Sequence, residues 1–471
     1  MSTTATAPLP PVEDDIEHIA LDEDYVLTPG FVEKVVDAAD DGDGLKLRSL
    51  LEDLHPADVA DLMGFLTEQH RAMVVVWLPP ELLADTLPEL DDGIREEVLE
   101  RVPHLTLAEA LQELDSDDAA AVVEDLEDDQ REKVLAAMPE VDRAAIESSL
   151  GYAEDSAGRL MQREVMAAPQ FWNVGDTIDH IRKQGEELPE LFFDIYVVDP
   201  LNRPVGGVPV SQLLRSPRAM TLTEIMGPIN EITVDQDQEE VAYIFEKYHL
   251  ISAPVIDVAG RLVGQITVDD IVNIIQEENR EDILRLAGVA DEDRGSSVPE
   301  IVRSRVPWLA INLATATLGA SVIGWFEGTI QHIVALAILM PIVSAIGGNA
   351  GTQALTVTVR ALATRELNSS NAPSTFWREL IVGFANGLVL APLIGLATAF
   401  WFRDEDWRIG LVIAAAMVLN LLVAATVGVL TPLTLSKFKF DPAVSSAVFV
   451  TATTDFFGFL IFLGLATIVL M

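Results

Sequence analysis

Residues 442–471 read PAVSSAVFVTATTDFFGFLIFLGLATIVLM, an apolar stretch with a single charge, Asp455. A helix crosses the hydrocarbon core of a bilayer in about 20 apolar residues, so this stretch is long enough to span a membrane. Four earlier uncharged stretches are also long enough, namely Val306–Phe326, Gly328–Val359, Leu380–Phe402 and Ile409–Ser436. The sequence therefore predicts an all-α transmembrane domain of five helices over residues 303–471.

Charge is divided unequally along the chain. The 471 residues carry a formal net charge of -45 and contain no cysteine, which excludes disulfides and thiolate metal sites. From Arg303 onward nine Lys/Arg face eight Asp/Glu, whereas the preceding residues hold 21 Lys/Arg and 67 Asp/Glu. Three explanations of such an acidic part are open. It is a solvated surface of a soluble domain, a compositional trait of a halophilic or high-GC lineage, or a sensor whose carboxylates repel one another until a divalent cation binds. It disfavours nucleic acid as a partner, because polyanions bind basic surfaces.

The acidic part begins with residues 1–28, whose acidic, Pro-rich composition predicts a disordered tail. Met1–Asp15 lacks the basic region that opens a signal peptide, so we expect the acidic part to stay in the cytoplasm. Residues 29–152 then show a helical repeat of about 25 residues that ends in proline, as in His55–Pro79, Pro80–Pro103 and Asp115–Pro139. This period predicts stacked hairpins, a superhelical α-helical N-domain; one irregular helical bundle is the alternative.

Residues 153–278 alternate between strand and helix patterns. The strand patterns Asp194–Val198 and Val205–Val210 precede a helix from Ser211. The same order recurs in Ala253–Ile256, Leu262–Thr267 and the helix Val268–Ile275. Two such α+β units resemble tandem CBS domains, with the first copy degenerate. A connecting, plug-like helix is expected over residues 279–302, around a helical pattern at Glu277–Ala287.

Positive residues indicate the orientation of the five spans. Two precede the first span, three lie between the second and third, and two lie between the fourth and fifth: Arg303, Arg305, Arg360, Arg365, Arg378, Lys437 and Lys439. The opposite side has Arg403 and Arg408 beside three acidic residues. We therefore expect the N-terminus inside and the C-terminus outside.

Asp455 is the strongest functional signal in the sequence. A carboxylate near the bilayer centre costs about 2.5–3.5 kcal/mol on the insertion scale. No Lys or Arg lies inside any of the five apolar stretches, so a structural ion pair is not expected. A protonated carboxyl bonded to a neighbouring helix and a proton relay are alternatives, and we favour a cation site.

The second apolar stretch contains polar residues that suit such a site. Asn349, Thr352, Gln353 and Thr356 recur at helical spacing beside the glycines of 347–351. Together with Pro341, these glycines predict a kinked or broken helix with exposed carbonyls. Carboxylate, amide and carbonyl oxygens suit a hard cation, whereas zinc, copper and iron would require His or Cys. The pairs Gly347/Gly351 and Gly383/Gly387 are alternatively packing contacts.

Three motifs resemble signatures of the MgtE family of magnesium channels: Gly347-Gly348-Asn349-Ala350-Gly351-Thr352-Gln353, Asp441-Pro442-Ala443 and Thr453-Thr454-Asp455. The predicted order of domains is also similar to that of the family. The resemblance implies a homodimer with one pore on the dimer axis, in which Mg²⁺ is both permeant ion and regulator. It implies the pore residues Asp455, Asn349, Gly348, Thr352, Thr356 and Thr451.

The resemblance also implies a cytoplasmic magnesium sensor that closes the pore. Its expected residues are Asp237, Glu239, Asp269, Asp270, Glu278, Glu281, Asp282 and Asp441. Each is expected to bridge to the N-domain or to the other subunit when Mg²⁺ binds. The alternative for each of them is a solvated charge.

The chain departs from the family pattern at several positions. Asn273 stands where the family often has Asp, and Thr352 where it often has Asn. The first CBS unit lacks the Thr-x-x-Asp motif that binds a nucleotide ribose, whereas the second keeps Thr267 and Asp270. We therefore expect at most one ATP site per chain.

The sequence thus predicts a multi-pass protein of the cytoplasmic membrane of a prokaryote, a passive magnesium-selective channel closed by Mg²⁺. The chain has no Gly-x-x-x-x-Gly-Lys loop for nucleotide hydrolysis, and we do not expect an enzyme. A proton-coupled divalent-cation transporter and a non-conducting membrane sensor are the alternatives.

Overall fold

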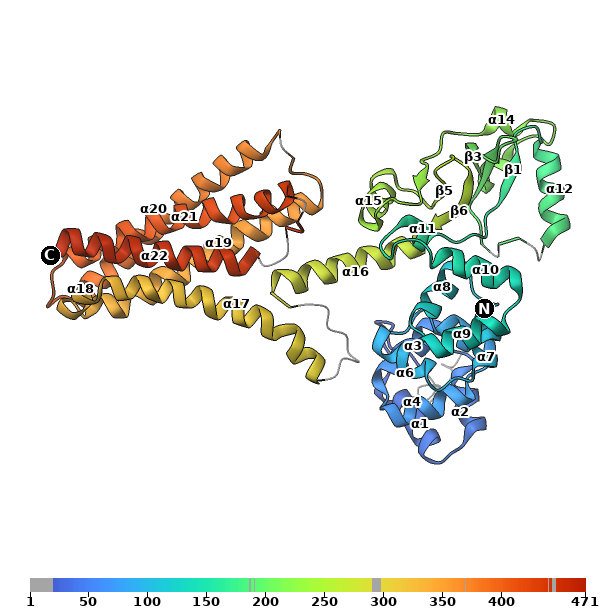
Figure 1. Ribbon diagram of the computed structural model, residues 1–471, viewed down its shortest axis with the longest axis horizontal. Coiled ribbons are helices and arrows are strands. Elements are labelled where there is room, and N and C mark those ends of the chain that lie inside the picture. The colour runs from blue at the N-terminus through green and yellow to red at the C-terminus, as the bar shows by residue number, and fades with distance from the viewer. Residues whose placement is uncertain are drawn as a thin grey trace, which may run out of the picture. The chain divides into compact units, whose positions relative to one another are not determined.

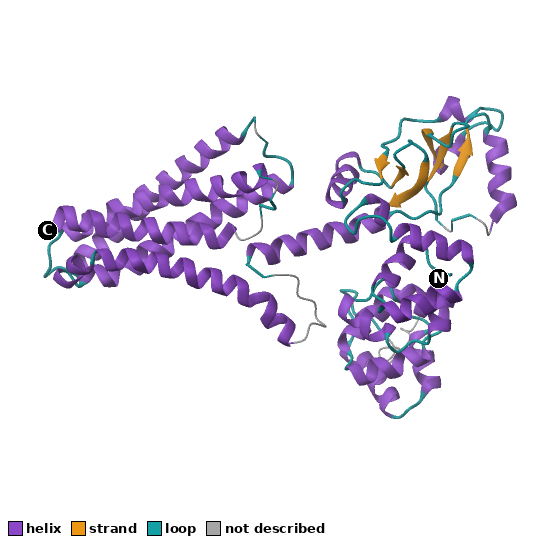
Figure 2. Cartoon of the chain, in the orientation of Figure 1, coloured by secondary structure: helices purple, strands orange, loops and turns teal. Residues whose placement is uncertain are grey.

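The computed structural model divides the chain into two units by its internal contacts, one ending at Ile275 and one beginning at Gln276 (Figure 1). The residues that it describes are 20–185, 188–189, 191–289, 298–368, 370–438, 440–442 and 446–471. Residues 1–19 of the expected tail, Lys439 and Ala443 lie outside them. The first unit contains helices and strands, and the described part of the second is helical (Figure 2).

Short helices in hairpin succession form the first part of the first unit. Several start at residues suited to the position: Thr28 and Thr67 accept hydrogen bonds from the first turns of α1 and α4, and α1, α3 and α5 each begin with proline. The two helices expected in each repeat are present, as α3 and α4, α5 and α6, and α8 and α9, and the repeats stack through alternate helices such as α3 on α5 and α4 on α6. The helices are α1 (Pro29–Asp40), α2 (Gly44–Leu51), α3 (Pro56–Phe65), α4 (Glu68–Trp77), α5 (Pro80–Thr86), α6 (Asp92–Leu99), α7 (His104–Ala110), α8 (Ser116–Glu124), α9 (Asp128–Ala137) and α10 (Glu140–Ser149).

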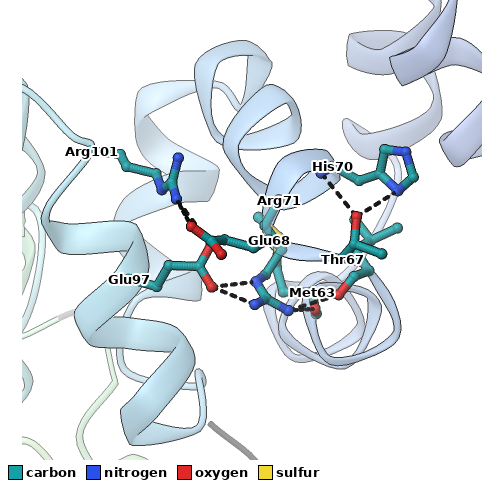
Figure 3. Close-up of polar contacts among 8 residues, drawn as sticks. Met63, Thr67, Glu68, His70, Arg71, Glu97 and Arg101 are labelled. Atoms are coloured by element: carbon teal, nitrogen blue, oxygen red, sulfur yellow. Dashed lines mark hydrogen bonds and ion pairs between the residues drawn. The ribbon is translucent and has the colours of Figure 1, made fainter. Parts of the chain in front are cut away.

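An arginine recurs at the same place in these hairpins. Arg71 of α4, labelled in Figure 3, donates to the carbonyl of Leu66 at 2.7 Å, at the end of α3. Arg95 and Arg131 donate likewise to the carbonyl five residues earlier, at 3.3 and 3.0 Å. Each guanidinium thus satisfies a carbonyl that the helix end leaves without a partner. Arg71 also pairs with Glu97 of α6, which joins one hairpin to the next.

Residues 20–28 correct the expected extent of the tail. Leu21 and Leu27 form an antiparallel bridge, and Leu27 is buried in the core of the helical domain. Thr28 then caps α1. The two leucines let this short segment bury apolar surface despite its acidic neighbours.

Both CBS-like units fold, including the degenerate first one. Each is a three-stranded sheet, β1-β2-β3 or β4-β5-β6, with its first pair parallel and its second antiparallel. Asp199 and Asp257 make matching turns before β3 and β6, each side chain accepting from two backbone amides. The elements are α11 (Ala157–Leu160), β1 (Ala167–Pro169), α12 (Val174–Gln184), β2 (Asp194–Val198), β3 (Pro204–Pro209), α13 (Val210–Arg215), α14 (Leu222–Ile225), β4 (Ile232–Thr233), α15 (Gln238–Tyr248), β5 (Ser252–Ile256) and β6 (Leu262–Thr267).

A single helix, α16 (Val268–Leu286), replaces the two helices expected at Val268–Ile275 and Glu277–Ala287. No Gly or Pro interrupts this sequence, so the helical hydrogen bonds continue through Gln276. The helix ends before Gly288, whose φ of 71° is the left-handed conformation that favours glycine after a helix.

Five of the described helices are long and apolar enough to cross a membrane. A short helix between the first two does not. Besides the second half of α16, the described residues of the second unit form α17 (Val298–Trp325), α18 (Glu327–His332), α19 (Ala335–Ala363), α20 (Ala372–Trp401), α21 (Arg408–Lys437) and α22 (Ser446–Leu470). The expected five-helix transmembrane domain is thereby supported.

The second apolar stretch was expected to be kinked or broken, and it is broken, but not at the glycine motif. Helix α19 runs without interruption through Pro341 and Gly347–Gly351. The chain instead breaks at Ile333–Val334, between α18 and α19. The glycines do not open the backbone, because neighbouring helices occupy the space beside them: a Cβ at Gly351 would lie 2.5 Å from the side chain of Val450.

Helix α21 packs against α19, α20 and α22. Glycines permit the closest of these contacts. A Cβ at Gly410 would lie 2.6 Å from the carbonyl oxygen of Gly395 in α20, and one at Gly428 would lie 2.7 Å from that of Gly351 in α19. The pair Gly383/Gly387 of α20 likewise lies against α21, at Leu421 and Val418.

Candidate functional site

Asp455 of α22 lies against α19 in the membrane domain. Its carboxylate accepts a hydrogen bond from the hydroxyl of Ser344. Helix α17 also approaches closely here, since a Cβ at Gly319 would be 3.8 Å from the Cβ of Asp455. The contact that the structure gives this carboxyl group is therefore with a neutral hydroxyl, and no Lys or Arg among the described residues is paired with it.

One face of α19 is polar and exposed. The side chains of Asn349, Thr352, Gln353 and Thr356 are exposed, whereas the glycines at 347 and 351 face the neighbouring helices. Exposed amides and hydroxyls are unfavourable against lipid, because the hydrocarbon offers them no hydrogen-bond partners. This face therefore requires water or protein opposite it.

Gly348 lies where the polar face of α19 approaches α22. A Cβ at Gly348 would lie 3.9 Å from the Thr451 and Thr454 side chains, so these helices approach closely near Asp455. Because α19 is intact, the Gly348 carbonyl remains within the helix, where it also accepts from the Thr352 hydroxyl at 3.1 Å. Thr356 donates in turn to the Thr352 carbonyl at 3.0 Å. The expected pore residues thus lie on two adjoining helices, but the backbone is not opened as expected.

An acidic cavity of about 190 Å³ lies in the first unit. It brings the first turn of α8 and the first turns of α16 together, and Asp117, Asp118 and Asp270 line it with Arg159 and Asn273. The Oδ1 atom of Asp117 is buried and has no hydrogen-bond partner among the described residues. Such an unpartnered carboxylate oxygen is suited to a cation.

Burial, together with repulsion between carboxylates, raises the pKa values of the acids in this cavity. Burial, and then repulsion from Asp270, raises the pKa of Asp117 well above its ordinary value. The same two causes, in the same order, raise the pKa of Asp118 to about 7. Burial raises the pKa of Asp270 to about 6, against a lowering by the hydrogen bond from Thr267. Bound positive charge would relieve this repulsion.

The cavity is not a closed set of metal ligands. No three His, Asp or Glu side chains of the described residues are arranged to hold a metal ion directly. Mg²⁺ commonly keeps several waters and binds through one or two carboxylates, which such a cavity can provide.

A second acidic cluster lies in the second unit. Burial, and then repulsion from Asp441 and Glu278, raises the pKa of Asp282 to about 6. Arg285 lies among these acids, because it pairs with Glu281 on its own helix and donates to Asp441 at 2.6 Å. Four of the expected sensor residues are therefore near one another, with an arginine that the sequence analysis did not consider.

The remaining expected sensor residues lie elsewhere. Asp237 is exposed and caps α15 by accepting from the Glu239 amide at 3.0 Å. Glu239 and Asp269 are exposed as well, and neither lines the acidic cavity. The structure gives Asp237 a local role that the sequence alone also allowed.

The expected nucleotide pair is in mutual contact. The Thr267 hydroxyl, at the end of β6, donates to the Asp270 carboxylate at 2.8 Å. Because Asp270 also lines the acidic cavity, one carboxylate takes part in both candidate sites.

The sequence analysis missed four residues of these sites: Ser344, Asp117, Asp118 and Arg285. Ser344 is one of many small polar residues in the spans, and its neighbour Asp455 lies on another helix. Asp117 and Asp118 are typical of the first turn of a helix, where acids favour the helix dipole. Their position opposite Asp270 is a tertiary contact that no local pattern indicates.

Three family models match the chain. One described as a divalent cation transporter matches residues 340–465, one described as the MgtE intracellular N domain matches 54–155, and a CBS domain model matches 222–277. The last covers the second α+β unit, in agreement with the degenerate sequence of the first.

Relatives match over most of the chain. It is 30% identical to the magnesium transporter MgtE of Bacillus subtilis over 430 residues, which are 91% of this chain and 94% of the relative. It is 34% identical to that of Thermus thermophilus over 450 residues, 92% of this chain and 97% of the relative. A solved structure of the cytosolic domain of the Mg²⁺ channel MgtE in complex with ATP is 32% identical, with a TM-score of 0.49, over 52% of this chain and 99% of that one.

Proposed function

The chain belongs to the MgtE family of magnesium transporters, and on that premise we propose that it is a passive Mg²⁺ channel whose ions pass Asp455. The observation that carries this proposal is the contact of Asp455 with a neutral hydroxyl, in a membrane helix beside an exposed polar face. A negative charge within a membrane span is costly without a positive partner, and a passing cation compensates for it.

The oxygen chemistry of the site suits magnesium. Mg²⁺ loses its water reluctantly, so a carboxylate with neutral amides and hydroxyls favours passage of a largely hydrated ion. A double charge moving inward across an inside-negative membrane gains about 4.6 kcal/mol per 100 mV. No further energy source is needed for uptake.

A second copy of the chain is the proposed partner for the polar face of α19. Asn349, Thr352 and Thr356 would then face the same residues of the other copy across a water-filled path. Gly348, Thr451 and Asp455 would lie alongside this path on the adjoining backbone and helix α22. The pore residues would thus be contributed by both subunits of a homodimer.

We further propose that cytoplasmic Mg²⁺ closes the channel through the two acidic groups. In the first unit, Mg²⁺ would bind between α8 and α16 at Asp117, Asp118 and Asp270. In the second unit, it would bind among Glu278, Glu281, Asp282 and Asp441, between α16 and the segment that precedes α22. We keep Asp237, Glu239 and Asp269 as proposed sensor residues, at exposed positions outside these two groups.

The orientation proposed from the sequence has the N-terminus and the acidic unit in the cytoplasm of a prokaryotic cell. Arg303 and Arg305 lie near the start of α17, Arg360 lies near the end of α19, and Lys437 is the last residue of α21. If successive spans cross in opposite directions, these ends share one side, which the positive-inside rule assigns to the cytoplasm.

ATP is a candidate ligand of the second CBS unit, through Thr267 and Asp270. The hydroxyl and carboxylate are already paired, so a ribose would compete with this contact. Calorimetric titration of ATP into the full-length protein, compared with Thr267→Val, tests this site. Equal binding by both proteins would exclude it.

The channel proposal is tested by ion flux through the purified protein in planar bilayers at a fixed voltage. We expect single-channel Mg²⁺ currents that fall with millimolar cytoplasmic Mg²⁺, and their loss in Asp455→Asn. Asp404→Asn, an acid outside the spans, is the matched control and should leave the currents unchanged. Flux that follows a pH gradient at constant voltage would instead indicate proton coupling, and no current at all a non-conducting sensor.

A further inference from the structure

Asn420 places an amide in the interior of the membrane domain. It lies on α21 and its side chain is fully buried. Its Nδ2 atom donates to the backbone carbonyl of Val343 on α19 at 3.0 Å. Its Oδ1 atom is buried without a hydrogen-bond partner among the described residues. A buried amide is costly unless it is hydrogen-bonded, so a role in packing alone would be met better by leucine.

Two glycines on different helices make room for this side chain. A Cβ at Gly347 of α19 would lie 2.1 Å from Asn420 Nδ2, and a Cβ at Gly458 of α22 would lie 2.9 Å from it. Both distances are shorter than real Cβ atoms show. One side chain of α21 therefore fills a notch in α19 and a notch in α22 at the same level.

This level is that of the Asp455 contact. Val343, whose carbonyl accepts from Asn420, directly precedes Ser344, whose hydroxyl donates to Asp455. Gly458 follows Asp455 by three residues, close to one helical turn. The Asn420 amide therefore contacts α19 and α22 next to Ser344 and Asp455, whose side chains are hydrogen-bonded to each other.

We infer that Asn420 is a positioning residue for ion selection. By its hydrogen bond to α19 and its seat against α22, it fixes the separation of these helices and so holds the Ser344 hydroxyl on the Asp455 carboxylate. A fixed carboxylate presents one spacing to a hydrated ion, whereas a carboxylate free to shift discriminates less between Mg²⁺ and the larger Ca²⁺. This inference rests on the proposed function of Asp455.

The test compares Mg²⁺ and Ca²⁺ flux into liposomes that contain the full-length protein. Asn420→Leu keeps the number and branching of the side-chain heavy atoms and removes the hydrogen bond, and we expect the ratio of Mg²⁺ to Ca²⁺ flux to fall about tenfold. Thr398→Val is the control and should leave the ratio unchanged, because the hydroxyl of Thr398 on α20 is also buried and has no hydrogen-bond partner in the described part of the chain. Asn420→Ser, which keeps a donor, should recover part of the ratio and serves if Asn420→Leu does not fold.

A double-mutant cycle separates positioning from packing. We expect Ser344→Ala to change the flux ratio in the wild type but by much less in Asn420→Leu, since the contact is already disturbed. An unchanged ratio in both Asn420 variants, or additive effects with Ser344→Ala, would overturn the inference. Asp455→Asn is measured in parallel. If Asp455→Asn leaves the Mg²⁺ flux unaltered, the pore proposal fails. If Asp455→Asn loses the flux while Asn420→Leu keeps the wild-type ratio of Mg²⁺ to Ca²⁺ flux, only the inference about Asn420 fails.

Discussion

The guanidinium of Arg285 donates a 2.6 Å hydrogen bond to the carboxylate of Asp441, 156 residues further along the chain. The same arginine pairs with Glu281 on its own helix, α16. A fixed positive side chain therefore already neutralises part of the acidic cluster that also contains Glu278 and Asp282. Magnesium that binds there has to compete with it or add to it.

Replacing Arg285 tests how this cluster senses magnesium. In Arg285→Gln the four carboxylates lose their fixed cation, so we expect lower thermal stability without Mg²⁺ and a larger stabilisation on adding it. The ion pair is partly exposed, so its loss should cost no more than about 1 kcal/mol. The measurement is the melting temperature of the purified protein across a magnesium titration.

Arg280→Gln is the matched control, because Arg280 pairs with Glu277 on the exposed side of the same helix. It should leave the magnesium dependence as in the wild type. Equal magnesium responses of the Arg285 and Arg280 variants would show that the contact with Asp441 is irrelevant to sensing.

Removing the hydroxyl beside the pore carboxylate should weaken ion binding. Ser344→Ala leaves Asp455 without its hydrogen-bond donor, and a hydrogen bond to a charged group is worth roughly 1.5–3 kcal/mol. We expect Mg²⁺ conductance to fall by about tenfold or more in single-channel recordings. Ser321→Ala, whose hydroxyl bonds to its own helix α17, is the control and should conduct normally. Normal conductance of both variants would contradict a role for the contact.

The acidic cavity predicts an unusual pH dependence. The folded-state pKa values of Asp118 and Asp270 are about 7 and about 6, above the ordinary aspartate value of 3.8, so the folded protein binds more protons than the unfolded chain from about pH 4 to about pH 7. The free energy of unfolding contributed by these groups therefore falls as pH rises from about 4 to about 7. Without divalent cations, we expect the first thermal transition to be several degrees lower at pH 8 than at pH 5.5.

Magnesium should reverse this loss at pH 8 and have less effect at pH 5.5, where the carboxylates are partly protonated. Asp270→Asn should reduce both the pH dependence and the magnesium response. Asp128→Asn, which changes a fully exposed acid of α9, should reduce neither. A pH profile of Asp270→Asn that matches the wild type would show that the dependence arises from the general acidity of the chain.

The sequence predicted the elements well because most of their signals are local. Strands β2 and β6 begin and end at the expected residues, since their apolar patterns and flanking turns are read along the chain. The membrane helices follow from length and hydropathy in the same way. The error in α19 arose because Gly347–Gly351 was interpreted without the helices that pack against it.

The candidate site was predicted less completely, for a related reason. Asp455 is conspicuous by itself, because a charge in an apolar stretch needs an explanation. Asn420 and Ser344 carry no charge, and their importance depends on which helix face they meet. Asp117 likewise becomes a candidate ligand through Asp270, 153 positions later in the chain. Contacts of this range are not encoded in any local pattern.

The contact between α19 and α21 predicts that replacing either of two glycines by alanine has markedly different effects on stability. A Cβ at Gly428 would lie 2.7 Å from the carbonyl oxygen of Gly351 and 2.8 Å from the Cβ of Ala354. Both are rigid groups of α19, so Gly428→Ala would push these helices apart and cost roughly 1–3 kcal/mol by overpacking. We expect lower thermal stability in detergent and reduced Mg²⁺ flux, because α19 carries the polar face. Gly324→Ala is the matched control, since no atom lies within 4 Å of a Cβ at Gly324 of α17. Because alanine also favours helix over glycine, this control should be neutral or stabilising, and equal stability of the two variants would show that the glycine contact does not set the helix spacing.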